Sequence, residues 1–398
     1  MLRFPNGFLW GAATAAHQIE GNNVHSDWWQ SEQAGLLPHR SEAANNSWTD
    51  WRQDIGLLTD IGLNAYRMSV EWARIEPEPG RFDQLALDTY TRQIDALKQA
   101  GIEPMVTLHH FTSPRWLAEI GGWRNPDVVD RFLDYTQRLS SSLKDQVRWW
   151  ITINEPSILG FKAYIEGSWP PHRAGNFSGY VRLMRHAARA HKRARQLLRS
   201  QRPDAMVSMA FAFWPLHPLR AWNPIDQLIA QVGDWVWQGR ILDRTMAALD
   251  WIGVNYYSRT FVGWPWPSNG SAGSGQRTDF GWEIYPQGLY DVLKRVGQYG
   301  KPVVITENGI SDADDDQRAE YIVDHVREMH RAIQAGVDLR GYMHWTLLDN
   351  FEWAEGYEQQ FGLATRDRRL RPSARVYGAI ARANGLPDDV LRGTFSVT

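Results

Sequence analysis

Eight short apolar runs, separated by longer amphipathic stretches, constrain the fold of this 398-residue chain more than any other feature. This alternation is typical of βα units, in which helices connect parallel strands. Eight such strands are the number that closes a (β/α)8 barrel, whose active site lies at the C-terminal ends of the strands. The expected strands are residues 8–13, 64–70, 104–109, 149–154, 206–211, 251–256, 303–307 and 342–346.

Helical periodicity supports the same α/β fold between the strands. Leu87, Tyr90, Ile94 and Leu97 recur at helical spacing before Gly101. A second periodic segment covers residues 321–333. We find neither an internal repeat nor a change of composition that would mark a linker. We therefore expect one catalytic barrel domain over residues 1–398, that is, a single TIM barrel.

Charge and composition limit the possible partners. The net charge is −2, which does not favour nucleic acid as a partner. The chain has no cysteine, which excludes disulfides and thiolate metal sites. No apolar run approaches the ~20 residues needed to span a bilayer, and residues 1–6 do not resemble a signal peptide. We expect a cytoplasmic protein with no membrane partner; its oligomeric state stays open.

Two of the expected strands end in a glutamate. Residues 150–155 read Trp-Ile-Thr-Ile-Asn-Glu, and residues 304–309 read Val-Ile-Thr-Glu-Asn-Gly. In an eight-stranded barrel Glu155 would end the fourth strand and Glu307 the seventh, so both would face one pocket. Two converging carboxyl groups are what the cleavage of a glycosidic bond requires. A lone glutamate is more often a surface residue, but two at equivalent positions indicate a sugar hydrolase.

Further polar and aromatic side chains lie at or near the ends of other strands. Any one of them could be structural, since a buried arginine can neutralise an internal acid and a tryptophan can belong to the core. Together they would form a ring that suits a neutral, polyhydroxylated ligand. They are His17, Gln18, Arg67, His109, His110, Asn255, Tyr257, Trp345, Glu352 and Trp353.

Metal and nucleotide sites are not supported by the sequence. His109 and His110 are adjacent on an expected strand, so they point to opposite faces and do not easily bind one ion. There is no H-E-x-x-H pattern, and Gly300-Lys301 is followed by proline rather than by the serine or threonine of a P-loop. We expect no metal and no cofactor.

Two segments that follow strands read as loops. Residues 263–281 are rich in glycine, serine, proline and tryptophan, and we expect Trp264 and Trp266 to form a wall of the substrate site. The acidic run Asp312 to Asp316 reads as a solvated turn.

Several motifs resemble glycoside hydrolase family 1, the β-glucosidase family, with a second-strand segment in the form seen in archaeal-type β-glycosidases. The resemblance runs from Phe4 to about Ala381. Its motifs are Phe8-Leu9-Trp10-Gly11-Ala12-Ala13-Thr14, His17-Gln18-Ile19-Glu20-Gly21, Arg67-Met68-Ser69-Val70-Glu71-Trp72, Thr152-Ile153-Asn154-Glu155-Pro156, Ile305-Thr306-Glu307-Asn308-Gly309 and His344-Trp345-Thr346-Leu347-Leu348-Asp349-Asn350-Phe351-Glu352-Trp353.

The resemblance implies a retaining exo-β-glycosidase that hydrolyses terminal β-D-glycosyl residues of glycosides or oligosaccharides through a covalent intermediate. It implies that Glu307 is the nucleophile, that Glu155 is the acid/base, and that Arg67 and Tyr257 orient Glu307. In the family, the residue matching Glu352 bridges sugar O4 and O6. The residues implied to bind substrate are Gln18, His110, Asn154, Asn255, Trp345, Glu352 and Trp353. Glucose, galactose and fucose all remain possible glycones.

Departures from the family pattern leave alternatives open on the aglycone side. Phe111 stands where a tryptophan is common, Thr112-Ser113 replaces an acidic-aliphatic pair, and the chain is shortened around residues 222–250. A 6-phospho-β-glycosidase is disfavoured, because the resemblance gives those members a serine at position 352 and a nearby lysine. A transglycosylating member stays possible. A sugar-binding barrel without catalysis has no support from the residues.

Overall fold

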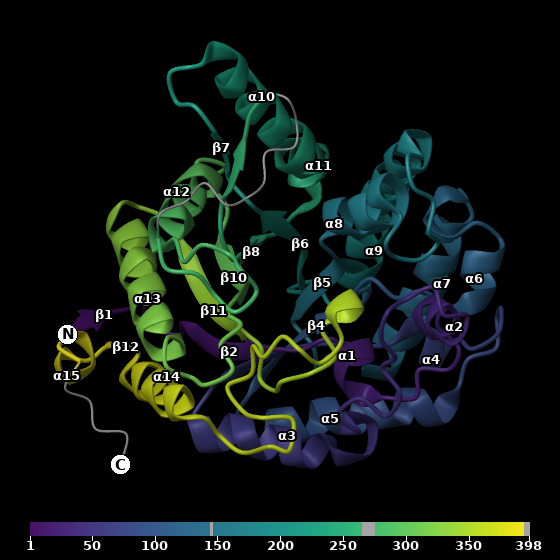
Figure 1. The fold of residues 1–398 in the computed structure, drawn as a ribbon. Helices are drawn as coiled ribbons and strands as arrows, with labels where there is room; N and C mark the ends of the chain where they lie inside the picture. The colour runs from purple at the N-terminus through teal and green to yellow at the C-terminus, as the bar shows by residue number, and fades with distance from the viewer. Residues whose placement is uncertain (144–145, 265–274, 394–398) are drawn as a thin grey trace.

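A closed barrel of eight parallel strands forms the centre of the computed structural model, which describes residues 1–143, 146–264 and 275–393 (Figure 1). Each strand pairs with its neighbours in the order β10-β11-β2-β3-β4-β5-β6-β8. The barrel strands are β2 (Leu9–Ala13), β3 (Ala65–Ser69), β4 (Glu103–Thr107), β5 (Trp149–Asn154), β6 (Met206–Phe213), β8 (Ile252–Tyr256), β10 (Val303–Asn308) and β11 (Leu339–Trp345).

All eight expected strands are therefore confirmed, with shifted ends. The largest shift is in β11, which begins three residues before the apolar run that the sequence shows. Arg340 is exposed and Gly341 follows it, so the first residues of β11 do not read as an apolar segment. β6 continues to Phe213, two residues beyond the expected end, and this extension reaches the rim of the barrel.

Helices surround the barrel, as Figure 1 shows for α3, α5, α13 and α14. The described helices are α1 (Ala16–Glu20), α2 (Asp27–Gln33), α3 (Ser47–Ile61), α4 (Trp72–Ile75), α5 (Gln84–Gln99), α6 (Arg115–Glu119), α7 (Val128–Leu143), α8 (Pro156–Gly160), α9 (Phe177–Gln201), α10 (Pro224–Asp234), α11 (Arg240–Thr245), α12 (Pro286–Gly297), α13 (Arg318–Gln334), α14 (Pro372–Ala383) and α15 (Asp388–Leu391). Short turns of other helix types are η1 (Gly122–Arg124), η2 (Phe161–Glu166), η3 (Trp235–Gly239), η4 (Met246–Ala248) and η5 (Trp353–Glu355).

The two helices expected from periodicity, α5 and α13, are both present. In α5 the Asp83 side chain accepts a hydrogen bond from the Ala86 backbone N–H at 3.1 Å, which satisfies one of the free donors of the first turn. The apolar residues Leu87, Tyr90 and Ile94 are fully buried against the barrel. Gly101 follows with φ of 73°, a conformation that ends the helix and that glycine adopts without strain.

Four short strands lie outside the barrel. β1 (Leu2–Arg3) pairs with β12 (Gly385–Leu386), which joins the two ends of the chain. β7 (Leu216–Pro218) pairs in parallel with β9 (Thr260–Val262). Because β7 and β9 follow barrel strands β6 and β8, they extend beyond the C-terminal end of the barrel, together with α10 at the top of Figure 1.

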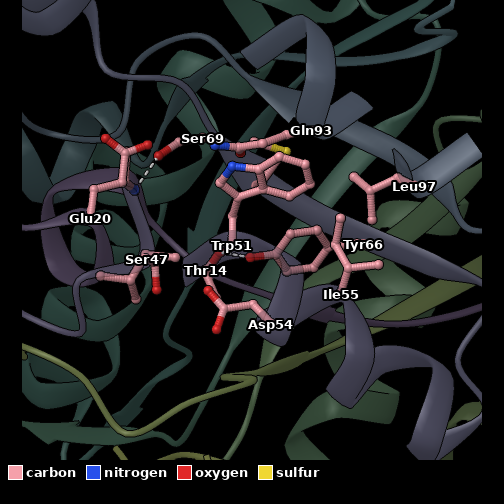
Figure 2. A pocket seen from close by; sticks show the side chains of 13 residues that line it. Thr14, Glu20, Ser47, Trp51, Asp54, Ile55, Tyr66, Ser69, Gln93 and Leu97 are labelled. Carbon is pink, nitrogen blue, oxygen red and sulfur yellow. Dashed lines mark hydrogen bonds between the residues drawn. The ribbon is translucent and has the colours of Figure 1, made fainter. Parts of the chain in front are cut away.

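The C-terminal end of β2 is fixed by polar contacts with β3, and this places α1. Thr14 Oγ1 is 2.5 Å from Tyr66 Oη, and the Ala16 backbone N–H donates to Ser69 Oγ at 2.7 Å (Figure 2). The cavity beside these residues has a volume of about 20 Å³, which is too small for a sugar. We conclude that this cavity belongs to the packing between the barrel and helices α3 and α5.

The acidic run after β10 is only partly the solvated turn that we expected. Asp314 and Asp316 are exposed, but Asp312 is buried and accepts from the backbone N–H groups of Gln317 and Arg318 at 3.1 and 2.8 Å. Asp315 forms an ion pair with buried Arg318. The expectation was wrong for these two residues because their carboxylates cap and neutralise the start of α13.

Candidate active site

A cavity with a volume of about 420 Å³ opens at the C-terminal end of the barrel. It is the largest cavity that we find among the described residues, and its volume suits a small ligand. Eight of the predicted site residues line it. They are His110, Glu155, Asn255, Tyr257, Glu307, Trp345, Glu352 and Trp353.

Glu155 and Glu307 reach this cavity from strands on either side of β6 and β8. Glu307 lies in β10, and Glu155 follows β5 directly and precedes Pro156, the first residue of α8. Glu155 has φ of 40°, a left-handed conformation that ends the strand and turns the chain into the helix. Only 8% of Glu155 and 4% of Glu307 is exposed. The barrel thus brings together two buried carboxyl groups that are far apart in the sequence.

Glu307 is surrounded by hydrogen-bond donors. Arg67 Nη1 donates to Glu307 Oε1, and Tyr257 Oη donates to Glu307 Oε2 at 2.8 Å. Arg67 is fully buried, and its Nη1 also donates to the Thr306 carbonyl at 2.9 Å. A buried guanidinium and a hydroxyl that both donate to one carboxylate hold it in a fixed orientation. Glu307 is therefore positioned by partners on both of its oxygens.

Glu155 has a different environment. Burial and, to a smaller extent, the nearby charge of Glu307 raise its pKa to about 8, although the hydrogen bond from Asn255 opposes the shift. Asn255 Nδ2 donates to Glu155 Oε1 at 2.7 Å. At neutral pH Glu155 is therefore mainly protonated and can donate a proton. The cavity therefore holds two carboxyl groups in different environments: Glu155 is suited to donate a proton, and Glu307 is held by two hydrogen-bond donors.

Three predicted residues are not among those that line the cavity but hydrogen-bond to residues that do. Arg67 Nη2 donates to Asn154 Oδ1 at 2.7 Å, and Asn154 Nδ2 donates to His110 Nε2 at 3.1 Å. Gln18 Nε2 donates to Glu352 Oε2 at 3.1 Å. Arg67, Asn154 and Gln18 are all fully buried. Arg67 and Asn154 connect Glu307, His110 and Asn255 by hydrogen bonds, and Gln18 holds Glu352 separately.

His110 is held as a neutral ring between two tryptophans. Its ring stacks on Trp345 and Trp353 at centroid distances of 5.8 and 5.9 Å. Burial and the charge of Arg67 hold the pKa of His110 well below its usual value. A neutral imidazole can accept from Asn154 through Nε2, and its Nδ1 is buried without a protein partner.

Glu352 is the third carboxyl group of the cavity. It follows β11 on the loop that precedes η5, and burial raises its pKa to about 8, with the Gln18 hydrogen bond opposing and the charge of Glu307 adding to the shift. Gln18 Nε2 also approaches the Asn350 side chain and the Phe351 carbonyl at 3.0 and 2.9 Å. These contacts tie the Glu352 loop to α1.

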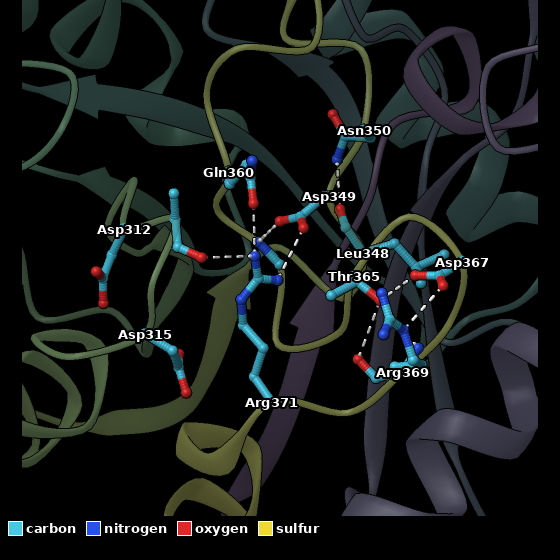
Figure 3. Close-up of polar contacts among 12 residues, drawn as sticks. Asp312, Asp315, Leu348, Asp349, Asn350, Gln360, Thr365, Asp367, Arg369 and Arg371 are labelled. Carbon is cyan, nitrogen blue, oxygen red and sulfur yellow. Dashed lines mark hydrogen bonds and ion pairs between the residues drawn. The ribbon is translucent and has the colours of Figure 1, made fainter.

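The loop that carries Glu352 rests on a buried ion pair (Figure 3). Arg371 Nη1 donates to Asp349 Oδ2 at 2.8 Å, and Arg371 Nη2 donates to Gln360 Oε1 at 2.7 Å. Asp349 Oδ1 accepts from the Gly362 backbone N–H at 2.8 Å. These bonds link both ends of the segment from residue 349 to residue 362, so they position Glu352 and Trp353 between them.

His17 and His109 lie near the cavity but do not line it. His17 is bonded to Glu32 at 3.1 Å, and His109 Nε2 accepts from the Trp123 indole N–H at 3.1 Å. The His109 imidazole therefore has different partners from the His110 imidazole, which accepts from Asn154.

Among the described residues, one group of three potential metal ligands has carboxylate oxygens within 4.8 Å of one another. This group lies outside the cavity. It consists of Asp312, Asp314 and Asp316 at the start of α13. The positive end of the helix dipole favours negative charge there.

The prediction that Trp264 forms a wall of the substrate site was wrong. Trp264 is 67% exposed, does not line the cavity, and donates its backbone N–H to Asp226 at 3.0 Å. Trp266 lies outside the described residues. The segment contributes Phe280 near its end, and Phe280 stacks on Trp282 at 4.3 Å.

Several lining residues were missed by the sequence reasoning. Trp214 directly follows β6, so the rule that strand ends carry functional side chains could have found it. The others come from helices and loops without such a signal. They are Ile158, Lys162, Glu166, Ser168, Trp169, Trp282, Ala354, Glu355 and Phe361. Phe111 also lines the cavity, where it packs against Trp169 at 4.9 Å.

Comparison with known proteins agrees with this geometry. The family model described as glycosyl hydrolase family 1 matches residues 1–247 and 240–386. The chain is 34% identical to β-glucosidase A of Thermotoga maritima, over 97% of this chain and 99% of that protein. It is 31% identical to a β-galactosidase of Sulfolobus acidocaldarius, over 98% and 97%. The structure of a β-glycosidase from Pyrococcus horikoshii superposes with a TM-score of 0.93, at 36% identity over 99% of both chains.

Proposed function

The chain belongs to glycosyl hydrolase family 1 and is a β-glucosidase-type glycoside hydrolase, and we propose that Glu155 and Glu307 carry out its reaction. The observation that supports this assignment most strongly is the contrast between the two carboxyl groups. Burial raises the pKa of Glu155 to about 8, whereas Glu307 accepts from both Arg67 and Tyr257. Two acids in one cavity with opposed environments are the arrangement that retaining glycosidases use.

In the proposed reaction, the Glu307 carboxylate attacks the anomeric carbon and forms a glycosyl ester. Glu155 gives its proton to the glycosidic oxygen, so the aglycone leaves as a neutral alcohol. Glu155, now ionised, takes a proton from the water that hydrolyses the ester, and both carboxyl groups return to their first state. Retention requires the carboxyl groups to lie roughly 5–5.5 Å apart.

We assign the glycone subsite to the residues around Glu352. Glu352 and Gln18 are bonded to each other, and the stacked rings of Trp345, His110 and Trp353 form the adjoining wall. Asn154 and Asn255 lie next to Glu155 and would address the sugar from the other side. Gln18 Oε1 and His110 Nδ1 are buried without protein partners, which fits two groups that a sugar hydroxyl would satisfy.

A neutral glycone is favoured over a phosphorylated one. Among the described lining residues, Lys162 is the single lysine or arginine, and its Nζ lies 2.8 Å from Glu166 Oε2. A phosphate group next to the Glu352 carboxyl would meet an acidic group without a free cation. β-D-glucosides are therefore the proposed substrates, with galactosides and fucosides accepted where the site tolerates the other O4 configuration.

We further propose that residues 1–398 form one catalytic domain, which acts in the cytoplasm on small β-glycosides. We propose that it has no nucleic acid or membrane partner and that its reaction needs no metal or cofactor. The net charge of −2 supports the exclusion of nucleic acid. None of the helices in the described part of the chain combines the length and the apolarity that crossing a membrane requires.

The configuration of the first product tests this proposal. During hydrolysis of an aryl β-glucoside followed by proton NMR, the β-anomer of glucose should form first and then mutarotate. Initial release of the α-anomer would contradict the covalent route. Product analysis with cellobiose and lactose would measure glycone preference, and the yield of new disaccharides would separate transglycosylation from hydrolysis.

A further inference from the structure

The outer face of α10 carries a stripe of exposed apolar side chains that no described part of the chain covers. The four residues of this stripe, Ile225, Leu228, Val232 and Trp235, are between 50% and 59% exposed. We name these four residues the α10 stripe. Large exposed apolar patches on soluble proteins usually mark interaction sites.

The spacing of the α10 stripe is that of one side of a coiled coil. Its residues follow one another at intervals of three, four and three, which corresponds to positions a, d, a and d of a heptad. Ile225 and Val232 occupy position a, and Leu228 occupies position d, so the apolar residues form one continuous seam along the helix. Ala230 lies at position f, on the opposite side of the helix from the stripe, and its side chain is buried. The stripe therefore has the width that one facing helix would cover.

The π-helical turn η3 ends this pattern. Apolar residues after it, Ile241 and Leu242 in α11, are buried in the protein, whereas those before it face outward. A π-helical turn contains an extra residue, which rotates the direction in which the following side chains point. The apolar face of α10 therefore points to the exterior, whereas that of α11 points into the protein. Trp237 within η3 already packs inward, against Phe161 at 4.6 Å.

The charges around the stripe favour a protein helix over a lipid surface. Residues 222–236 contain no lysine or arginine, although interfacial membrane helices usually carry basic residues that attract anionic lipid. Their two carboxylates, Asp226 and Asp234, form ion pairs with Arg220 and Arg295. Two copies of this uncharged surface can therefore meet without electrostatic repulsion.

The apolar area is sufficient for an interface. Trp222 and Trp264 extend the surface at the N-terminal end of the stripe and are 79% and 67% exposed. With Trp235 they expose on the order of 400 Å² of aromatic surface, since a whole tryptophan presents up to ~250 Å². This is about half of the ~800 Å² that one partner contributes to a standard interface. The aliphatic members of the stripe supply much of the remainder.

We propose that the α10 stripe is the contact between two copies of this chain, related by a two-fold axis. A two-fold contact brings the same surface of both copies together, and we place its axis perpendicular to α10, so that the two α10 helices cross antiparallel. Leu228 of each copy then lies against Val232 of the other, and Ile225 lies against Trp235. α10 projects beyond the C-terminal end of the barrel (Figure 1), and the four side chains of the α10 stripe are exposed.

Light scattering coupled to size-exclusion chromatography tests the interface. The 398-residue protein at tens of micromolar should have twice the monomer mass of 45.8 kDa. Leu228→Asp should be monomeric, and its activity per chain on an aryl glucoside would show that it is folded. Leu85→Asp is the matched control, because Leu85 is 67% exposed on α5, away from the stripe. A monomeric wild type, or a Leu228→Asp variant that remains dimeric, would overturn the proposal.

Cross-linking tests the antiparallel register. Because the chain has no cysteine, the double variant Leu228→Cys/Val232→Cys should give a covalent dimer on mild oxidation, and each single variant should give at least fivefold less. Equal cross-linking of single and double variants would exclude the register. Co-flotation of the wild-type protein with neutral or anionic lipid vesicles, lost in Leu228→Asp but not in Leu85→Asp, would assign the stripe to a bilayer and also overturn the proposal.

Discussion

Asn255 donates from Nδ2 to Oε1 of Glu155 at 2.7 Å, a bond that favours the ionised form of the carboxyl group. The pKa of Glu155 is nevertheless raised to about 8, because burial and the charge of Glu307 outweigh the bond. The amide therefore fixes the orientation of Glu155 without removing its proton. Orientation and protonation are separate requirements for a general acid, and different neighbours of Glu155 meet them.

Replacing Glu307 with glycine should abolish hydrolysis while leaving the fold intact, because the covalent route needs this carboxylate. Added azide should restore turnover of an aryl glucoside and give the α-glucosyl azide, the product of inverted configuration. The configuration can be read by NMR. Substantial activity without azide would place the nucleophile elsewhere.

Replacing Glu352 with serine should reduce kcat/KM for glucosides at least tenfold. The change removes the partner of Gln18 and a hydrogen-bonding group for the sugar, and each neutral hydrogen bond contributes about 0.5–1.5 kcal/mol. Gln18→Ala and the double variant complete a double-mutant cycle measured by steady-state kinetics. Strictly additive losses would indicate that the contact between Gln18 and Glu352 does not matter for binding.

The ion pair beneath the Glu352 loop should matter for stability. Arg371→Met leaves Asp349 buried without its cation, and breaking a buried pair in this way costs about 3–5 kcal/mol of unfolding free energy. Arg369→Met is the control, since Arg369 and Asp367, also drawn in Figure 3, form an exposed pair for which about 0–1 kcal/mol is expected. Urea denaturation measures both losses, and equal values would show that burial of the Arg371 pair is not important.

The raised pKa of Glu155 predicts a pH-dependent cost to stability. The folded protein binds this proton more tightly than the unfolded chain, whose ordinary value is 4.5, so stability falls as pH rises from about 4.5 to about 8. Glu155→Gln does not titrate and should become more stable than wild type across this window, by up to about 5 kcal/mol. Thermal melts at pH 5 and pH 8 measure the effect. Glu320→Gln is the control, because Glu320 is exposed. A similar gain in stability in both variants would show that the gain does not come from the raised pKa of Glu155.

The sequence predicts the barrel, and the residues at strand ends that line its cavity, for one physical reason. Strand ends in a parallel barrel converge on one face, so the positions of Glu155, Asn255 and Glu307 follow from local patterns alone. The wall opposite them depends on long-range packing. Trp214 and Trp282 come together at 4.9 Å from different loops, and nothing local distinguishes Trp282 from the exposed Trp264.

The burial of the acidic run after β10 was unpredictable for a related reason. Asp312 accepts a hydrogen bond from the Arg318 backbone N–H, and Asp315 forms an ion pair with the Arg318 side chain. Asp315 also accepts from the backbone N–H of Ser373, which lies more than fifty positions further along the chain. A run of four aspartates within five residues reads as solvated until these partners are known.

The central claim, that Glu155 is the general acid and base, is tested most directly by a leaving-group series in the Glu155→Ala variant. General acid catalysis contributes roughly 10²–10⁴-fold. Alkyl glucosides and cellobiose should lose this full factor, whereas formation of the glycosyl-enzyme from a dinitrophenyl glucoside should be almost unaffected. Stopped-flow measurements should then show a burst of dinitrophenolate followed by slow turnover with a low KM, and the alkaline limb of the pH–rate profile should flatten. Equal losses for good and poor leaving groups would contradict the assignment.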